Sequence, residues 1–524
     1  MRLPPRLGLI SVLLSAGVFA DNILNACSAL SDSLGDRVAY PNSTTYTTCM
    51  SYWSARQSTQ RPACLVTPAT ADEVALVLTT LIRASAPFTV RAGGHTAHAN
   101  GSNTDDGVTV DLALLRTLRL NDDDDDDDDD NDNDETIVSV GAGLRWGDVS
   151  AALDPRGLAV LGGRDADVGV AGLLLGGGFS YFSGRHGWAC DNVRGMEVVL
   201  ASGEIVHASA EQHQDLFKAL KGGGGSSFGV VTRFDLATIR QGDLWTRTVV
   251  FAGQAKEAIA EAATALITQG IEDDPDAHAY FVRTHQPSYG GFINLASFFH
   301  ATPPPPPSSS ALNASTYATP PAFQPFDAIP GTLSNTSMVA NLTAVSRSIS
   351  TPYGQRQAWS NIAFAAGSPA VITALLALWE DAVLQIVPQA AARGAAYSPF
   401  AIYQAISSSH LRASHRRGGG GGNSMGLSPD DGPMVMMHFL TACDDEALDE
   451  AVLQSTRELV RAAEEETRRR GASRRFVYMN YGGEWQHVLQ RYGPKNYLEL
   501  LQTSLRYDPH RDLQRLWRGY FKLY

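Results

Sequence analysis

Two glycines and a histidine, Gly93, Gly94 and His95, lie in the segment FTVRAGGHTAHANGS directly after a strand-like run. Glycine has no side chain to block the approach of another molecule, and its backbone N–H groups bind phosphate well. Histidine can act as a metal ligand, a proton carrier or a nucleophile. The loop could therefore cradle a phosphate, hold a metal ion or carry a cofactor.

A metal site would use His95 and His98, which stand three residues apart. That spacing could bind zinc if both residues lay on a helix. The two histidines flank a glycine turn instead, and no third ligand follows a clear pattern. We therefore expect no metal site here.

Two further glycine-rich segments, GLLLGGGFS at 172–180 and KGGGGSSFG at 221–229, favour a dinucleotide ligand. Loops of this kind bind pyrophosphate through their backbone N–H groups. The segment at 172–180 does not match the βαβ dinucleotide-binding fingerprint, because it does not open the first strand-to-helix turn of such a unit. Taken alone, this glycine run is a weak indication of function.

The elements that position these loops can be predicted from local patterns. A capping box of Thr70 and Glu73 begins a helix, and strands are expected at 88–91, around 108–112 and around 136–140. A strand–turn–strand occupies 196–209, and a helix, a glycine loop and a strand occupy 215–236. Residues 58–239 are thus predicted to form an α+β unit. The apolar residues of the first helix recur at helical spacing: Val74, Val77, Leu78, Leu81 and Ile82.

The rest of the 524-residue chain is long enough for a second domain. From 240 to 470 the pattern changes to longer helices, such as 370–387, and scattered strands, such as 433–442. Runs of proline and glycine at 303–307 and 418–422 are typical of exposed loops. The last residues, 471–524, are rich in aromatic side chains.

The formal net charge of −14 comes mostly from one stretch, in which 12 carboxylates lie between residues 122 and 135. Two strand-like segments flank this stretch, so we interpret it as an enlarged hairpin loop. A calcium site is not favoured, because the carboxylates lack a spaced ligand pattern. The basic cluster at 468–475 is interpreted as a helix end, and nothing indicates nucleic-acid binding.

The N-terminus has the form of a secretory signal peptide. Arg2 and Arg6 precede an apolar run from Leu7, and Val18 and Ala20 are placed as a small-residue cleavage site. We expect cleavage after Ala20 and a secreted protein that acts as a monomer. We expect no membrane span, since no later apolar run is long enough.

Secretion permits disulfides and glycosylation. Cys27 and Cys64 are the expected disulfide pair, and a bridge over some 37 residues contributes roughly 3–4 kcal/mol. Of the remaining Cys49, Cys190 and Cys443, at least one is expected to be a buried free thiol. Glycosylation sequons occur at Asn42, Asn313, Asn335 and Asn341, and another at Asn100 lies close to the glycine loop.

Taken together and in order, the motifs resemble one family. They are VTPATADEV, VRAGGHTAHANGS, VGAGLRWGDV, DVGVAGLLLGGGFSYFSGRHGWACDNV, DLFKALKGGGGSSFGVVTRFDL and the C-terminal FVYMNYGG. The family is that of secreted FAD-linked oxidases of the vanillyl-alcohol-oxidase/p-cresol-methylhydroxylase (PCMH) type, in its fungal berberine-bridge-enzyme-like branch. The resemblance covers nearly the whole chain after residue 20.

The resemblance implies an α+β fold whose PCMH-type FAD-binding domain, 58–239, has two subdomains. It implies a substrate domain, 240–470, with an antiparallel sheet backed by helices. A C-terminal segment, 471–524, would return to the flavin. These parts follow the signal peptide, 1–20, and an N-terminal segment, 21–57.

The resemblance also implies that FAD is bound covalently through His95, at the 8α-methyl carbon of the flavin, with Gly93 and Gly94 beside the pyrophosphate. A covalent bond keeps the cofactor on a protein that leaves the cell. Further cofactor contacts are implied for other residues of the same motifs: Arg91, Thr96, Val168, Gly169, Gly172, Gly176, Gly177, Asn192, Gly229, Val230 and Asn480.

The sequence departs from the family pattern at one important position. Many relatives carry a second flavin linkage through a cysteine, and Asp165 stands there in the segment GRDADVG. We therefore predict a single covalent bond. Val168 matches a position that influences oxygen access in relatives, and a valine there favours an oxidase.

For catalysis the resemblance implies Tyr478 and Tyr481, in the segment YMNY. A tyrosine base has an ordinary pKa near 10 and needs a nearby positive charge or hydrogen bonds to act. The sequence does not name that partner. The expected function is oxidation of an alcohol, a carbohydrate or a secondary metabolite by hydride transfer to FAD, which O2 then reoxidises to give H2O2. The alternatives are a dehydrogenase with another acceptor and a non-catalytic flavin-binding relative.

Overall fold

The structure is a computed structural model that describes residues 8–121, 136–305, 317–349, 351–417 and 422–523. The predicted loop at 122–135 and the sequon at Asn313 lie outside the described residues. Within these described residues three β-sheets organise the fold, and they confirm the predicted α+β class. The first two sheets lie within 38–240, and the third lies within 244–474.

The first sheet has four strands in the order β1 (Val38–Ala39), β2 (Cys64–Val66), β4 (Val108–Asp111) and β3 (Phe88–Arg91). Strands β2, β4 and β3 are parallel to one another. Helix α4 (Ala71–Arg83) begins as predicted, with Thr70 Oγ1 accepting a hydrogen bond from the Glu73 N–H at 3.2 Å. The glycine–histidine loop leaves this sheet at the carboxyl end of β3.

The second sheet has the order β5 (Leu118–Asn121), β6 (Ile137–Gly141), β10 (Val230–Arg240), β8 (Val193–Val199) and β9 (Ile205–Ser209), and β7 (Leu158–Val160) also pairs with β10. The antiparallel pairing of β5 with β6 confirms that the acidic stretch connects a hairpin. Two short helices, α5 (Trp146–Leu153) and α8 (Gln214–Gly223), contact strands of this sheet, and α6 (Val170–Leu175) packs on α8.

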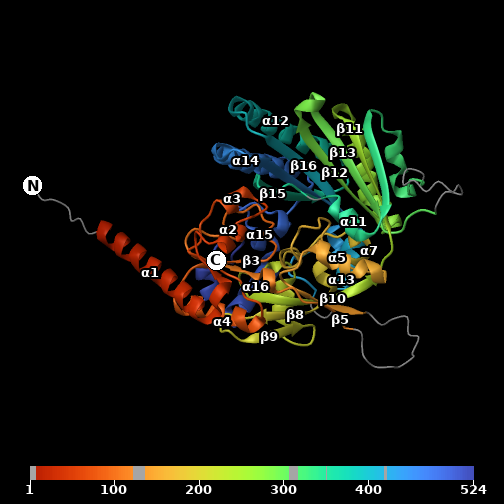
Figure 1. Ribbon diagram of the computed structural model, residues 1–524. Helices are drawn as coiled ribbons and strands as arrows, with labels where there is room; N and C mark the ends of the chain where they lie inside the picture. Colours follow the sequence, from red (N-terminus) through yellow and green to blue (C-terminus); the bar gives the residue numbers. More distant parts are fainter. Residues whose placement is uncertain (1–7, 122–135, 306–316, 350, 418–421, 524) are drawn as a thin grey trace, which may run out of the picture.

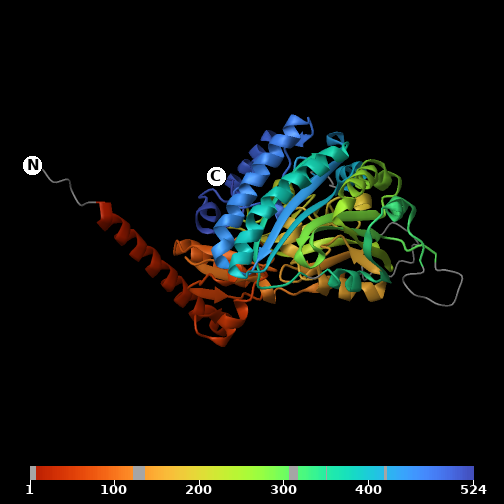
Figure 2. The same ribbon diagram turned by 90° about the horizontal axis from the view of Figure 1, so that it is seen from above.

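The third sheet has eight antiparallel strands. Helices α9 (Lys256–Ala265), α12 (Pro369–Arg393) and α14 (Asp449–Arg469) cover one of its faces, as Figures 1 and 2 show. The predicted antiparallel sheet backed by helices is therefore confirmed. Its strands run in the order β14 (Thr332–Ala340), β11 (Leu244–Ala252), β13 (Gly291–His300), β12 (Ala277–Gln286), β16 (Tyr397–Ile406), β17 (Met434–Cys443), β15 (Arg356–Ala365) and β18 (Ser473–Arg474).

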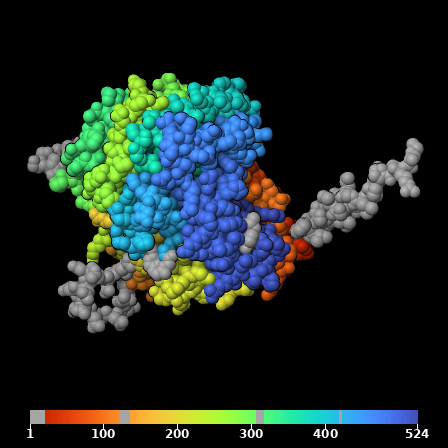
Figure 3. All heavy atoms as spheres, turned by 180° about the vertical axis from the view of Figure 1, so that it is seen from behind, coloured from red at the N-terminus to blue at the C-terminus, as the bar shows by residue number. Residues whose placement is uncertain are grey.

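Residues after 474 leave the third sheet and pack against the first two. Helix α16 (Pro494–Tyr507) lies on α8, and Phe88 of β3 forms a bridge with Trp517. Seen from behind, the C-terminal residues form a continuous band with those of α14 (Figure 3). The C-terminal segment thus joins the two halves of the molecule.

Helix α12 corrects one expectation from the sequence, because it is long and apolar enough to cross a membrane by length and composition. In the fold it is a core helix, and Val371, Ile372 and Leu375 are buried against the third sheet. Its Glu380 binds Arg283 of β12. These contacts hold one side of α12 on the third sheet.

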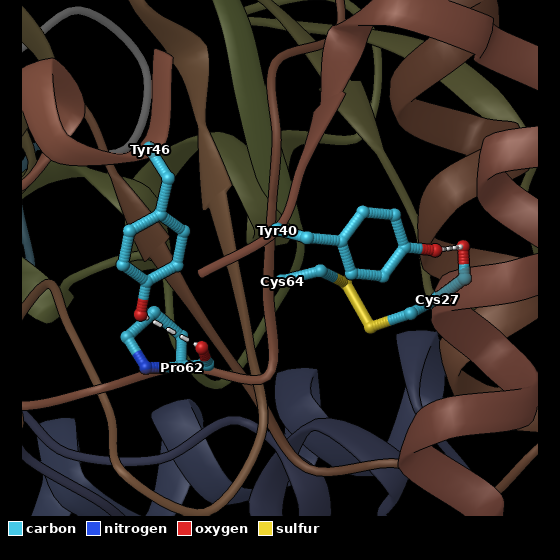
Figure 4. Close-up of a disulfide and its surroundings, with 5 residues drawn as sticks. All are labelled: Cys27, Tyr40, Tyr46, Pro62 and Cys64. Carbon is cyan, nitrogen blue, oxygen red and sulfur yellow. Dashed lines mark hydrogen bonds between the residues drawn. A yellow bond between two sulfur atoms is a disulfide. The ribbon is translucent and has the colours of Figure 1, made fainter. Parts of the chain in front are cut away.

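The disulfide between Cys27 and Cys64 is confirmed, with an S–S distance of 2.04 Å. It links α1 (Gly8–Leu34) to β2, and the Tyr40 hydroxyl donates a hydrogen bond of 3.0 Å to the Cys27 carbonyl (Figure 4). The three other cysteines are free, and Cys190 and Cys443 are buried, as expected for at least one of them. Asn42, Asn335 and Asn341 are exposed, and their glycosylation stays a prediction.

Replacing both Cys27 and Cys64 by serine is expected to lower the free energy of unfolding by roughly 3–4 kcal/mol, because the open chain gains entropy when unfolded. Urea denaturation of the double variant and the parent protein measures this difference. A matched control is Cys443→Ser, which removes a buried free thiol. A double variant no less stable than the parent would show that α1 is not fixed by this bridge.

Candidate active site

A cavity of about 740 Å³ lies where the three sheets meet. Its walls come from the loops of the first two sheets, from the uncovered face of the third sheet and from the C-terminal segment. Twelve of the predicted site residues line it: Gly93, Gly94, His95, Thr96, Val168, Gly169, Gly172, Gly229, Val230, Tyr478, Asn480 and Tyr481. Segments as far apart as 93–96 and 478–481 are therefore brought together.

The glycine loops meet at one wall of this cavity. A Cβ built on Gly93 would lie 2.5 Å from the Gly169 Cα, so the two backbones approach as closely as only glycine permits. Arg145 holds this contact by donating a hydrogen bond of 2.8 Å to the Gly93 carbonyl. At Gly172 of α6, by contrast, a Cβ would meet no atom within 4 Å. The wall thus presents bare backbone to open space, a surface suited to a closely fitting planar cofactor.

His95 lines the cavity and is almost fully buried, with 9% of its side chain exposed. Its ring stacks on Trp53 at a centroid distance of 4.1 Å and an interplanar angle of 17°. His95 Nε2 lies 3.4 Å from Thr351 Oγ1 and 3.9 Å from Asp165 Oδ2. Burial lowers the pKa of His95 to about 4, so the imidazole is neutral at physiological pH.

Four predicted cofactor residues, Arg91, Gly176, Gly177 and Asn192, do not line the cavity. Arg91 binds the Cys49 and Ser51 carbonyls and lies 4.1 Å from the Tyr52 ring centroid. These contacts fix the start of the loop instead of facing a ligand.

The other three residues pack behind the wall. A Cβ on Gly176 would overlap Asn480, and Gly177 has φ +111° with Met425 beside it. Asn192 Nδ2 donates hydrogen bonds to the His186 and Trp188 carbonyls at 3.0 and 2.9 Å. Gly176, Gly177 and Asn192 therefore shape the loop, and none of the three lines the cavity.

The two predicted catalytic tyrosines have different surroundings. Tyr478 is 1% exposed, and its hydroxyl accepts hydrogen bonds of 3.0 Å from the Gly178 N–H and from Asn480 Nδ2. Burial raises the pKa of Tyr478 far above its usual value, so this phenol stays protonated. The Tyr481 hydroxyl accepts a hydrogen bond of 3.1 Å from Arg164 Nη2. Tyr481 is therefore the better candidate for a proton acceptor.

Arg164 is the functional residue that the sequence did not reveal. Its Nη1 donates 2.7 Å to Gln404 Oε1 and lies 3.0 Å from His278 Nε2. Within the described part of the chain, no carboxylate forms an ion pair with Arg164. A charged residue in the glycine-rich segment next to Asp165 is the one signal that could have drawn attention to it. Its charge lies near the rings of Phe179 and Tyr280 and contacts the hydroxyl of Tyr481.

The third sheet contributes polar groups that lack a partner. Among the described residues, Thr284 Oγ1, Trp359 Nε1, Gln404 Nε2 and His438 Nε2 are buried without a hydrogen bond. All four residues line the cavity, and they come from β12, β15, β16 and β17. An unsatisfied buried polar group costs about 1–3 kcal/mol, so a bound molecule with polar groups of its own would stabilise this wall.

Burial lowers the pKa of His410 and of His438 to about 3. Because the unfolded chain takes up protons below about pH 6.5 and these folded histidines do not, the stability that they carry is present above pH 6.5 and falls as the pH drops towards 3. At pH 5 each of these two histidines is expected to lower the free energy of unfolding by roughly 2 kcal/mol relative to its value above pH 6.5. His410→Phe is expected to weaken the pH dependence of unfolding between pH 7 and 5. An unchanged slope in urea denaturation would show that His410 is protonated in the fold.

Sequence comparison relates this chain to known FAD-binding proteins. Residues 62–209 match the family model described as an FAD binding domain. The chain is 32% identical over 484 residues to the FAD-dependent monooxygenase tpcD of Cochliobolus heterostrophus, covering 90% of this chain and 87% of that protein. It is 31% identical over 501 residues to the FAD-dependent monooxygenase sdcF of Emericella nidulans, covering 95% and 98%.

Solved structures share the fold at low sequence identity. The xylooligosaccharide oxidase of Myceliophthora thermophila superposes with a TM-score of 0.70 at 20% identity, covering 94% of this chain and 99% of that one. The glucooligosaccharide oxidase of Acremonium strictum, described with a 6-S-cysteinyl, 8α-N1-histidyl FAD, gives a TM-score of 0.67 at 15% identity, covering 93% and 97%. The predicted family is therefore confirmed: this chain belongs to the FAD-dependent oxidoreductases with a PCMH-type FAD-binding domain, together with these fungal FAD-dependent monooxygenases.

Proposed function

We propose that this protein oxidises a small organic substrate by transferring a hydride to FAD bound covalently at His95, with O2 as the final electron acceptor and H2O2 as the second product. The observation that carries the proposal is the single cavity in which the facing glycine loops, a neutral buried His95 and Tyr481 with its arginine partner meet. When bound, FAD supplies the hydride acceptor, and the protein supplies binding, orientation and proton transfer.

The residues present fit this cofactor. The open space beside Gly172 and the bare backbone at Gly93 and Gly169 accept a planar ring system. His95 is neutral, and a neutral imidazole can act as a nucleophile, whereas an imidazolium cannot. Asp165 cannot form the thioether of the Acremonium oxidase, which supports a single linkage. The Cys27–Cys64 disulfide supports secretion, since disulfides persist in oxidising compartments.

Tyr481 takes the substrate proton in this proposal. Tyr481 lines the cavity, and Arg164 donates a hydrogen bond of 3.1 Å to its hydroxyl, which supplies the positively charged partner that a tyrosine base needs. The ring is held by a parallel stack on His438, with centroids 4.2 Å apart and an interplanar angle of 6°. Tyr478 and Asn480 position the cofactor wall through their bonds to Gly178 and to the Leu173 carbonyl.

A second candidate function is oxygenation of the substrate, favoured by the name that the fungal relatives carry. It differs from oxidation in where the oxygen atoms go. An oxidase returns both atoms of O2 as H2O2, and a monooxygenase places one atom in the product. A dehydrogenase would instead reduce a dye or quinone while consuming little O2.

The experiment is to screen alcohols, oligosaccharides and aromatic metabolites with the purified protein while recording O2 consumption and H2O2. For each substrate that is converted, the product is analysed by mass spectrometry after reaction under ¹⁸O2. Equal amounts of H2O2 and unlabelled product support the oxidase. Labelled product supports the monooxygenase, and rapid dye reduction with slow O2 consumption supports the dehydrogenase. Substrate conversion with none of these acceptors would overturn the proposal.

A further inference from the structure

Four side chains from distant parts of the chain form a hydrogen-bonded group around His95. Trp53 Nε1 donates to Thr351 Oγ1 at 2.9 Å. Thr351 Oγ1 donates to Asp165 Oδ2 at 3.2 Å. His95 Nε2 lies 3.4 Å from the same Thr351 oxygen, and Asp165 Oδ2 lies 3.9 Å from His95 Nε2.

The positions of the hydrogen atoms in this group can be assigned by counting its hydrogen-bond donors and acceptors. An indole N–H only donates, so Trp53 uses one lone pair of the Thr351 oxygen. Asp165 Oδ1 accepts from the Asp167 N–H at 2.9 Å and Asp165 Oδ2 accepts from the Thr351 hydroxyl at 3.2 Å, so both oxygens of this carboxyl group act as acceptors. The single hydroxyl hydrogen of Thr351 is therefore committed to Asp165. Towards His95 the Thr351 oxygen can only accept.

It follows that the proton of the neutral imidazole lies on Nε2, and that Nδ1 keeps its lone pair. Histidine tautomers are set in this way by the partner of the other ring nitrogen. Stacking on Trp53 holds the ring in this orientation.

We propose that Thr351 and Asp165 are positioning residues for cofactor attachment: they fix His95 as the Nε2–H tautomer, so that Nδ1 is the atom that bonds to the flavin. The inference rests on the covalent FAD of the proposed function. Asp165 stands where relatives have the cysteine of the second linkage. A carboxylate therefore lies beside His95, the attachment residue that is kept.

The step balances with O2 as the oxidant. A bond forms between His95 Nδ1 and the 8α carbon of the flavin, while one C–H bond of the 8-methyl group and the Nε2–H bond break. The Nε2 proton leaves towards the Thr351–Asp165 pair, which lies within 3.4–3.9 Å of it. The two hydrogens and two electrons lost by the methyl group and the imidazole reduce one O2 to H2O2.

The test measures attachment instead of turnover. The full chain is produced with little flavin, mixed with FAD under air, and sampled by acid precipitation, and the flavin fluorescence of the pellet is recorded over time. Thr351→Val and Asp165→Asn are expected to bind FAD but to attach it at least about 10-fold more slowly, the size of effect seen for outer-shell partners of ligating histidines. Thr351→Ser keeps the hydroxyl and should attach FAD at the parental rate.

A matched control is Thr264→Val, which removes a buried hydroxyl that donates to the Ala260 carbonyl of its own helix at 2.7 Å. Parental attachment rates in both Thr351→Val and Asp165→Asn would overturn the inference while leaving His95 as the attachment site. Absence of attached flavin in the parent protein itself would instead overturn the covalent linkage of the proposed function, and the inference with it.

Discussion

Tyr481→Phe is expected to lower kcat/KM by about 10²–10⁴-fold, the usual contribution of a general base, while leaving FAD in place. Phenylalanine keeps the ring that stacks on His438 and removes only the oxygen that Arg164 contacts. Stopped-flow reduction of the flavin by substrate measures the step directly. Its pH profile should also change, because position 481 would no longer carry a hydroxyl that takes part in proton transfer.

The matched control for this change is Tyr46→Phe. Tyr46 is also buried, its hydroxyl donates to the Pro62 carbonyl at 2.9 Å (Figure 4), and it does not line the cavity. Tyr46→Phe should reduce the flavin at the parental rate. A Tyr481→Phe protein that is equally fast would remove Tyr481 from the mechanism and leave Arg164 without its assigned role.

Gly169→Ala and Gly172→Ala are expected to have opposite effects on the protein without FAD. A Cβ at Gly169 would lie 2.6 Å from the Gly93 Cα, so the two loops must separate, at a cost of roughly 2–4 kcal/mol. A Cβ at Gly172 meets no protein atom and lies inside α6, where alanine stabilises a helix by about 0.5–1 kcal/mol relative to glycine. Thermal denaturation of the flavin-free proteins distinguishes the two.

The same Gly172→Ala change places a methyl group in the space assigned to the cofactor. FAD affinity, measured by titration before attachment, should fall about tenfold or more, which corresponds to about 1.4 kcal/mol. A stabilised protein that binds FAD less tightly is a combination that general damage to the fold cannot produce. Unchanged affinity would show that the flavin lies elsewhere in the cavity.

Much of the fold could be predicted from the sequence because its signals are local. The Thr70–Glu73 capping pattern and the apolar spacing that follows define α4 within 14 residues. The hairpin of β5 and β6 follows from two strand-like segments on either side of a charged run. The glycine loops can be identified in the sequence as part of the site because close backbone contact permits only glycine, as the approach of Gly93 to Gly169 shows.

The rest of the site depends on contacts between residues far apart in the chain. Arg164 and Tyr481 are 317 positions apart, and Thr351 and His95 are 256 apart, so no local pattern pairs them. At α12 the expectation that no later apolar run is long enough for a membrane span is wrong, because this helix has the length and composition of a span although it packs on a sheet. Contacts between residues far apart in the chain determine both the site and the packing of α12, and a single sequence does not reveal which distant residues are in contact.

The measurement that tests the central claim most directly is peptide mass spectrometry of the acid-precipitated protein. The account predicts one flavin adduct on the peptide that contains His95, none on the peptide that contains Asp165, and none on any peptide of the His95→Ala variant. An unmodified His95 peptide from protein that converts substrate would contradict it.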